Sequence, residues 1–152
     1  TLNTSGTASP IIDNGELDFT VSNDSHSSLT YKDRQDLKNG EVGVELSEAD
    51  DTGIVIAFIN DSDYYAVIVY DASSAIISKR NTIELIKKTG STYSSPLATS
   101  SIDFTRGTNH TFHATIDNGI ITAFFDNVEA WNHDTGSINL QKQIIFLLHI
   151  LL

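Results

Sequence analysis

The sequence contains no cysteine, and only nine of its 152 residues are lysine or arginine. Without cysteine there is no disulfide framework, no thiolate nucleophile and no cysteine-ligated metal. The 20 aspartates and glutamates give a formal net charge of −11, and an acidic surface repels phosphate groups. We therefore expect neither nucleic acid nor an anionic membrane as a partner. The length is that of a single domain.

The chain also lacks the short motifs of nucleotide binding and nucleophilic catalysis. No phosphate-binding loop, no G-x-G-x-x-G and no G-x-S-x-G occurs. The five histidines show no metal-ligand pattern, because His110 and His113 are three apart on an expected strand and face opposite sides. The most apolar run, residues 143–152, is too short to span a bilayer as a helix, which takes about 20 residues. We therefore expect no membrane insertion.

What the sequence has instead is a repeated pattern of apolar strand, tight polar turn and apolar strand. Two of the turns are Asn14-Gly15 and Asn118-Gly119, and a third lies within residues 59–64. Asn-Gly between alternating apolar residues is a strong hairpin signal, because a type I′ turn needs positive φ at both central residues. The pattern predicts antiparallel hairpins and an all-β sandwich.

Further strands are expected from alternating or continuous apolar residues. Residues 54–59 and 64–70 are near-continuous apolar runs, which are typical of central strands buried on both faces. A Ser/Thr-rich loop is expected after residue 88. The remaining strands are expected at residues 9–13, 16–22, 41–47, 82–88, 111–116, 120–125, 128–131 and 136–140. We take residues 1–142 as one domain and residues 143–152 as an apolar closing strand or a non-native tail.

The order of motifs from Asn39 onward resembles a known family. The segments are NGEVGVEL, DDTGIVIAF, NDSDYYAVIVY, HTFHATIDNGIITAFFDNV and GSINL. They resemble the concanavalin-A-like, laminin-G-like jelly roll in the version found in carbohydrate-binding modules and phage tail adhesion domains. The resemblance covers roughly residues 6–140. It implies two packed antiparallel sheets, one convex and one concave.

Laminarinase-type glycoside hydrolases share this jelly roll and carry the motif E-x-D-x-E on one strand. Here Glu16 and Asp18 match the first two positions, but Thr20 stands in the third. Period two places all three residues on one strand face, and retaining hydrolysis needs a second carboxyl group about 5–5.5 Å away as acid/base. Since Thr20 cannot serve as that acid, we interpret the segment as a solvated strand face and expect no enzyme.

Two acidic loops are candidates for a calcium site. Ca²⁺ takes 6–8 oxygen ligands, and the resemblance implies that one calcium can lie near a rim of the sandwich. Turn chemistry, in which Asx side chains bond their own backbone, explains the same residues. The candidate metal ligands are Asp50, Asp51, Asp61 and Asp63.

Sugar binding requires an aromatic surface for the apolar side of the ring and planar polar groups for its hydroxyls. Trp131 is the single tryptophan, and its polar neighbours suggest a loop. Tyr70 and Tyr93 are further aromatic candidates, and core packing is the alternative for each tyrosine. The predicted ligand-binding residues are Trp131, Tyr64, Tyr65, Arg34, Arg80 and Asn132.

These observations favour a non-catalytic, lectin-like adhesion domain that recognises carbohydrate or a cell-surface polysaccharide. We expect it in a modular bacterial surface protein or in a phage tail or baseplate, and hence in an extracellular, cell-surface or virion setting. The alternative is a structural sandwich that forms homo-oligomers in a virion or surface fibre and binds no sugar. A glycoside hydrolase is the third reading.

Overall fold

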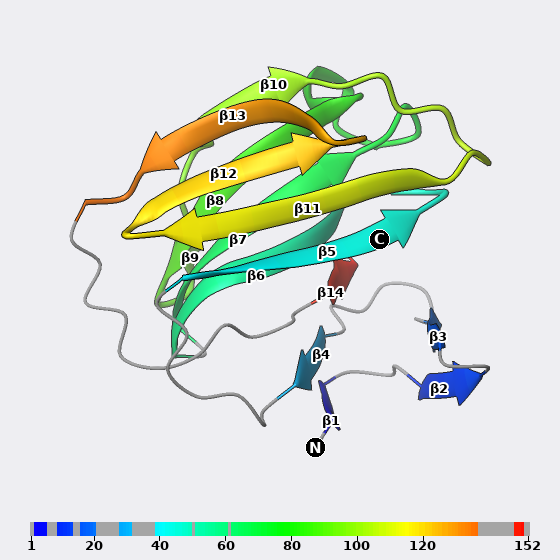
Figure 1. Cartoon of the computed structure of the whole chain (residues 1–152), viewed down its shortest axis with the longest axis horizontal. Helices are drawn as coiled ribbons and strands as arrows, with labels where there is room; N and C mark the ends of the chain where they lie inside the picture. Colours follow the sequence, from blue (N-terminus) through cyan, green and yellow to red (C-terminus); the bar gives the residue numbers. More distant parts are fainter. Residues whose placement is uncertain are drawn as a thin grey trace.

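A computed structural model of the chain describes residues 39–49, 51–60 and 62–136. It also places five short strands outside these ranges, of which only the backbone pairing is described (Figure 1). These are β1 (Leu2–Ser5), β2 (Ser9–Asp13), β3 (Glu16–Thr20), β4 (Ser28–Tyr31) and β14 (Leu148–Ile150). For residues 58–60, too, only the backbone is described.

Two antiparallel sheets lie face to face, one behind the other in Figure 1. The larger sheet has the strand order β10-β8-β7-β6-β14, with β9 paired to β8, and the smaller has the order β13-β12-β11-β5. The prediction of an all-β, two-sheet sandwich is therefore confirmed. The strands are β5 (Gly40–Leu46), β6 (Thr52–Asn60), β7 (Asp63–Tyr70), β8 (Thr82–Thr89), β9 (Thr92–Tyr93), β10 (Ala98–Ser101), β11 (His110–Asp117), β12 (Ile120–Phe125) and β13 (Val128–Asp134).

The predicted hairpins form with the expected register. Strands β11 and β12 close on the pair Asp117 and Ile120. Between them Asn118 and Gly119 have φ of +48° and +87°, as a type I′ turn requires. Strands β2 and β3 pair from Ser9 with Thr20 to Asp13 with Glu16, and β6 and β7 form a further antiparallel hairpin. Local turn chemistry thus determines where these strands meet.

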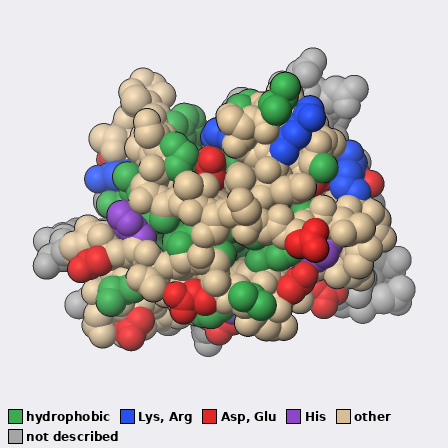
Figure 2. Space-filling model, turned by 90° about the horizontal axis from the view of Figure 1, so that it is seen from above, with side chains coloured by type: hydrophobic (Ala, Val, Ile, Leu, Met, Phe, Trp, Pro, Cys, Tyr) green, Lys and Arg blue, Asp and Glu red, His purple; other side chains and the backbone are tan. Residues whose placement is uncertain are grey.

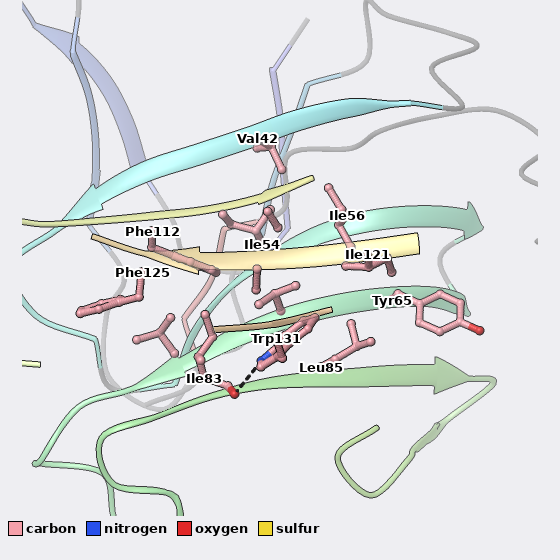
Figure 3. Packing of buried hydrophobic residues seen from close by; sticks show 14 of the residues in the cluster. Val42, Ile54, Ile56, Tyr65, Ile83, Leu85, Phe112, Ile121, Phe125 and Trp131 are labelled. Atoms are coloured by element: carbon pink, nitrogen blue, oxygen red, sulfur yellow. Dashed lines mark hydrogen bonds between the residues drawn. The ribbon is translucent and has the colours of Figure 1, made fainter. Parts of the chain in front are cut away.

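The core lies between the two sheets. Along β11 buried and half-buried residues alternate, and Phe112, Ala114 and Ile116 point inward. They belong to one cluster with side chains of the larger sheet such as Ile54 and Leu85, and Figure 3 shows Phe112 in this layer. Burying one large apolar side chain contributes about 1.5–3 kcal/mol, so this layer provides the main stabilisation of the sandwich.

Two strands occur where the sequence predicted a Ser/Thr-rich loop. Strand β10 pairs with β8, with Ala98 opposite Leu85 and Ser101 opposite Thr82, and β9 pairs with the end of β8. The prediction was wrong because β10 is an edge strand. One side of an edge strand meets solvent, so hydroxyl side chains are tolerated there and no apolar alternation is needed.

Two more observations concern the helical content and the apolar run at the end of the sequence. The 3₁₀ turn η1 (Ile77–Lys79) is the sole helical segment in the part that the structure describes, and no helix there is long and apolar enough to cross a membrane. Within the apolar run 143–152, β14 pairs with β6 through Leu148 and Ile54. The division of the chain at residue 142 stays a prediction.

Candidate functional site

A hollow lies on the outer face of the larger sheet, the face turned away from the smaller sheet. Along β7, Tyr64, Ala66, Ile68 and Tyr70 alternate with core residues and form a second apolar cluster. The register places Ala66 directly between Val55 of β6 and Ile86 of β8. Because a small side chain stands between two larger ones, the surface dips there into a cavity of about 370 Å³.

The walls of the hollow come from two connecting segments. Ile76 and Lys79 belong to the segment between β7 and β8, and Tyr93 and Ser94 belong to the segment between β8 and β10. Tyr93 is 43% exposed and marks the rim. Asp51, just before β6, completes the lining on the side of Tyr70.

At one end of the hollow Lys79 organises the polar groups. Its Nζ donates to the Tyr70 hydroxyl at 3.0 Å, lies 4.6 Å from the centre of the Tyr70 ring and pairs with Glu84 at 3.0 Å. Burial alone would lower the pKa of Lys79, but the hydrogen bond to Tyr70 and the contact with Glu84 outweigh it and raise that pKa. Burial raises the pKa of Tyr70, and the hydrogen bond and charge of Lys79 offset this increase only in part. Lys79 is therefore charged and Tyr70 neutral at physiological pH.

At the other end two tyrosines face each other. The Tyr64 and Tyr93 hydroxyls are 3.3 Å apart, and Lys88 Nζ lies 5.2 Å from the Tyr64 ring centre. Burial, with a smaller contribution from the hydrogen bond to Tyr93, raises the pKa of Tyr64. The Tyr64 hydroxyl thus stays protonated at physiological pH, so it can both donate and accept hydrogen bonds.

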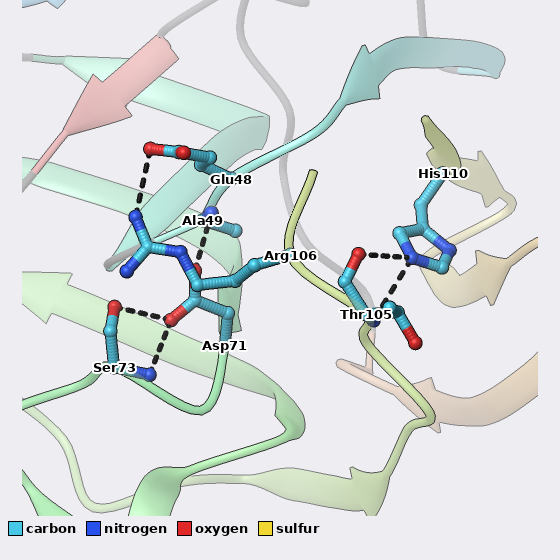
Figure 4. A network of polar contacts seen from close by, with 7 residues as sticks. All are labelled: Glu48, Ala49, Asp71, Ser73, Thr105, Arg106 and His110. Carbon is cyan, nitrogen blue, oxygen red and sulfur yellow. Dashed lines mark hydrogen bonds and ion pairs between the residues drawn. The ribbon is translucent and has the colours of Figure 1, made fainter. Parts of the chain in front are cut away.

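The wall that carries Ile76 and Lys79 is held by a buried carboxylate (Figure 4). Asp71 is fully buried. Its Oδ1 accepts from the Ser73 amide at 2.6 Å, and its Oδ2 accepts from the Ala49 amide at 3.1 Å. Arg106 reaches Asp71 at 3.4 Å and Glu48 at 2.8 Å. This network joins the segment after β7 to the loop after β5, so it positions the wall without touching the hollow.

Charge is distributed unevenly over the surface. The outer face of the smaller sheet exposes Glu41, Glu45 and Glu129, whereas Lys79 and Lys88 belong to the side of the hollow. Figure 2 agrees: carboxylates gather in the lower half of the view, and Lys and Arg gather in the upper half. The hollow is therefore less acidic than the formal charge of −11 would suggest.

The structure does not bring the six predicted ligand-binding residues together. Trp131 lies in strand β13, not in the loop that its neighbours suggested. Its ring is packed in the core, 8% exposed, and its indole N–H donates to the Ile83 carbonyl at 3.0 Å (Figure 3). Tyr65 also belongs to the core between the sheets. Both side chains point inward, because alternation along a strand assigns the face.

The other four predicted residues are dispersed. Tyr64 lines the hollow. Arg80 Nε donates to the Ser74 carbonyl at 2.8 Å, and Asn132 Nδ2 donates to Glu129 Oε1 at 2.9 Å on the opposite side of the sandwich. Arg34 lies outside the described residues.

Of the candidate calcium ligands, the two that the structure describes, Asp51 and Asp63, do not lie together. Asp51 precedes β6 and Asp63 begins β7, so the two acidic loops lie at opposite ends of this hairpin. Pairing of Thr52 with Val69 at one end separates them by roughly 25 Å, at about 3.3 Å per strand residue. Asp51 and Asp63 are therefore too far apart to bind one ion. The calcium site stays a prediction, since Asp50 and Asp61 fall outside the described residues.

Three of the aromatic candidates do meet: Tyr64, Tyr70 and Tyr93 surround the hollow. Lys79 and Ala66 were not foreseen. The period of two from Tyr64 through Ala66 to Tyr70 is visible in the sequence. Nothing in the sequence shows that a distant segment supplies Tyr93 or Lys79.

No protein-family model and no curated protein sequence matches the chain. Solved structures do resemble it. Carbohydrate binding module CBM66 from Bacillus subtilis has a TM-score of 0.71 at 12% identity, over 99% of this chain and 87% of that one. A Bacillus subtilis protein of unknown function with a galectin-like fold scores 0.70 at 12% identity, over 98% and 82%.

A third similar structure is the exoplasmic/lumenal domain of VIP36 in its Ca²⁺/Man-bound form. Its TM-score is 0.67 at 13% identity, over 98% of this chain and 75% of that one. At such identities the likeness shows the fold. The chain is a concanavalin-like, galectin-like jelly roll, as the resemblance implied.

Proposed function

We propose that this chain is a non-catalytic carbohydrate-binding domain that holds a sugar in the hollow above Ala66. The observation that carries the proposal is the joining of three tyrosines around one open cavity with an aliphatic floor. Its volume of about 370 Å³ falls within the about 300–1,000 Å³ typical of small-molecule sites.

The lining suits a sugar for two physical reasons. A pyranose ring has an apolar side formed by its C–H groups, and the Tyr rings and the aliphatic floor offer a matching surface. Its hydroxyls need partners at the edge, which the Tyr70 and Tyr64 hydroxyls and Lys79 can supply as donors and acceptors. The hollow therefore combines the two features that the sequence assigned to Trp131 and its polar neighbours.

Two of the similar structures support this proposal. They include a carbohydrate binding module and a domain in a Ca²⁺/Man-bound form. The proposed setting is extracellular, lumenal or on a cell or virion surface, as an adhesion domain of a modular bacterial protein or a phage tail. The exoplasmic/lumenal origin of one neighbour supports it.

The proposal is tested by a glycan array on the whole chain, followed by titration of the best glycan. Ala66→Leu fills the centre of the hollow, whereas Thr115→Leu adds the same side chain to the outer face of the smaller sheet. We expect Ala66→Leu to weaken binding at least tenfold and Thr115→Leu to leave it unchanged.

Circular dichroism and melting curves of both variants verify folding. An array on which no glycan is retained refutes the proposal and leaves the structural, oligomerising sandwich as the better reading. Retained affinity in folded Ala66→Leu would place the sugar elsewhere.

A further inference from the structure

We propose that the hollow selects a sugar that carries an acyl group, such as the N-acetyl group of an amino sugar, and seats the acyl methyl on the floor at Ala66. This inference rests on the proposed function and adds the chemical class of the ligand. It follows from where apolar and polar groups stand within the hollow.

The floor consists of one cross-strand row of aliphatic side chains. Val55, Ala66 and Ile86 are adjacent on three neighbouring strands, with exposed fractions of 0%, 3% and 7%. A sugar hydroxyl placed on this row would lose its water partners and find none in return, which is unfavourable. A methyl group placed there loses only its contact with water, which is favourable.

The polar groups stand on the two sides of this row, along β7. Tyr64 is two residues from Ala66 along β7 and Tyr70 is four residues away, so the two tyrosines stand roughly 7 Å and 13 Å from it. Tyr64 meets Tyr93 at one end, and Tyr70 meets Lys79 at the other. A ligand that fits has an apolar group in the middle and hydrogen-bonding atoms on both sides. An acetamido group beside ring hydroxyls has this arrangement.

The charges lining the hollow do not call for an anionic ligand. Lys79 pairs with Glu84 at 3.0 Å, Lys88 lies 5.2 Å and 5.9 Å from the ring centres of Tyr64 and Tyr93, and Asp51 lines the same end as Lys79. A carboxylate on the sugar would compete with Glu84 for Lys79. A neutral acylated sugar leaves that ion pair intact.

The test compares matched pairs of methyl glycosides by titration calorimetry. Glucose, galactose and mannose are each compared with the corresponding 2-acetamido-2-deoxy sugar, so that each pair differs only at the 2-position. We expect the acetamido member to bind at least tenfold more tightly in one or more pairs. Ala66→Val, which narrows the floor, and Ala66→Ser, which adds a hydroxyl at nearly unchanged size, should each reduce this preference below about threefold.

The outcomes separate this inference from the proposed function. The acyl inference is overturned if no pair shows a preference, whether both members bind equally or neither binds. In that case the proposed function still stands if the array retains other glycans. An array with no retained glycan overturns both. If the preference persists in Ala66→Ser, whose volume change is small enough for folding, the acyl group does not sit on this floor and the inference is wrong.

Discussion

Trp131 provides the sharpest test of the arrangement described above, because the sequence suggested a binding residue and the structure places it in the core. The change Trp131→Ala removes an indole that is 8% exposed, together with its 3.0 Å hydrogen bond from β13 to the Ile83 carbonyl of β8. That bond links the two sheets, so its loss affects how they pack.

The expected cost follows from burial. Truncation of a buried Trp or Phe to Ala costs about 3–5 kcal/mol. In a domain of about this size each kcal/mol lowers the melting temperature by roughly 2–4 °C, so the midpoint should fall by roughly 6–20 °C. Trp131→Phe keeps most of the ring but loses the hydrogen bond, worth about 0.5–1.5 kcal/mol, and should fall between wild type and Trp131→Ala.

The assay pairs thermal unfolding with glycan titration at a temperature where every variant is folded. Asn132→Ala is the matched control, because Asn132 is exposed and donates a hydrogen bond to the exposed Glu129; the stability of this variant should stay within about 0.5 kcal/mol of wild type. We expect Trp131→Ala to keep the affinity of wild type. Tenfold weaker binding with an unchanged midpoint would show that the indole stacks on the ligand, and the core placement would be wrong.

Three further predictions concern stability. Burial acts to raise the pKa of Asp71, but the hydrogen bonds from Ser73 and Ala49 and the charge of Arg106 lower that pKa overall. The ionised carboxylate therefore stabilises the fold at any pH above its unfolded pKa of about 3.9. This stabilisation is lost as the pH falls through the lower pKa of the folded state. Urea unfolding between pH 7 and pH 3 should show this loss, which should shrink in Asp71→Asn, a change costing about 1.5–3 kcal/mol at pH 7; an identical pH profile in both proteins would contradict the network. Gly43→Ala should destabilise by about 1–3 kcal/mol, because its Cβ would stand 2.8 Å from His113 Cβ, and an unchanged melting curve would refute the close approach of β5 and β11. Lys79→Met should lower the melting temperature, since it leaves Glu84, 6% exposed, without its ion pair, and should weaken glycan binding, since it removes a donor that lines the hollow. Lys87→Met, on β8 beside the core residue Tyr65, is the control, and equal effects of the two would remove Lys79 from the site.

The positions of most strands could be predicted from the sequence because the controlling interactions are local. Asn118-Gly119 supplies the positive φ values that a type I′ turn requires, and the hairpin then forms between residues already close in the chain. The continuous apolar run of residues 64–70 indicates burial on both faces of the sheet, and all of these residues are buried. The spacing of His110 and His113 likewise predicted that the two face opposite sides of β11, and in the structure His110 is buried whereas His113 is half-buried.

What each face meets was decided only by tertiary structure. Strand period shows that Tyr64 and Tyr65 point to opposite sides, but it does not say which side packs against the second sheet. Only the packing of the two sheets settles that, because Tyr65 lies in the cluster shared by both sheets and Tyr64 in the cluster on the other face. For the same reason polar neighbours could not show that Trp131 is buried. The hollow depends on a small residue, Ala66, lying between side chains of two other strands, and on walls supplied by distant segments, and a linear sequence carries no direct record of such contacts.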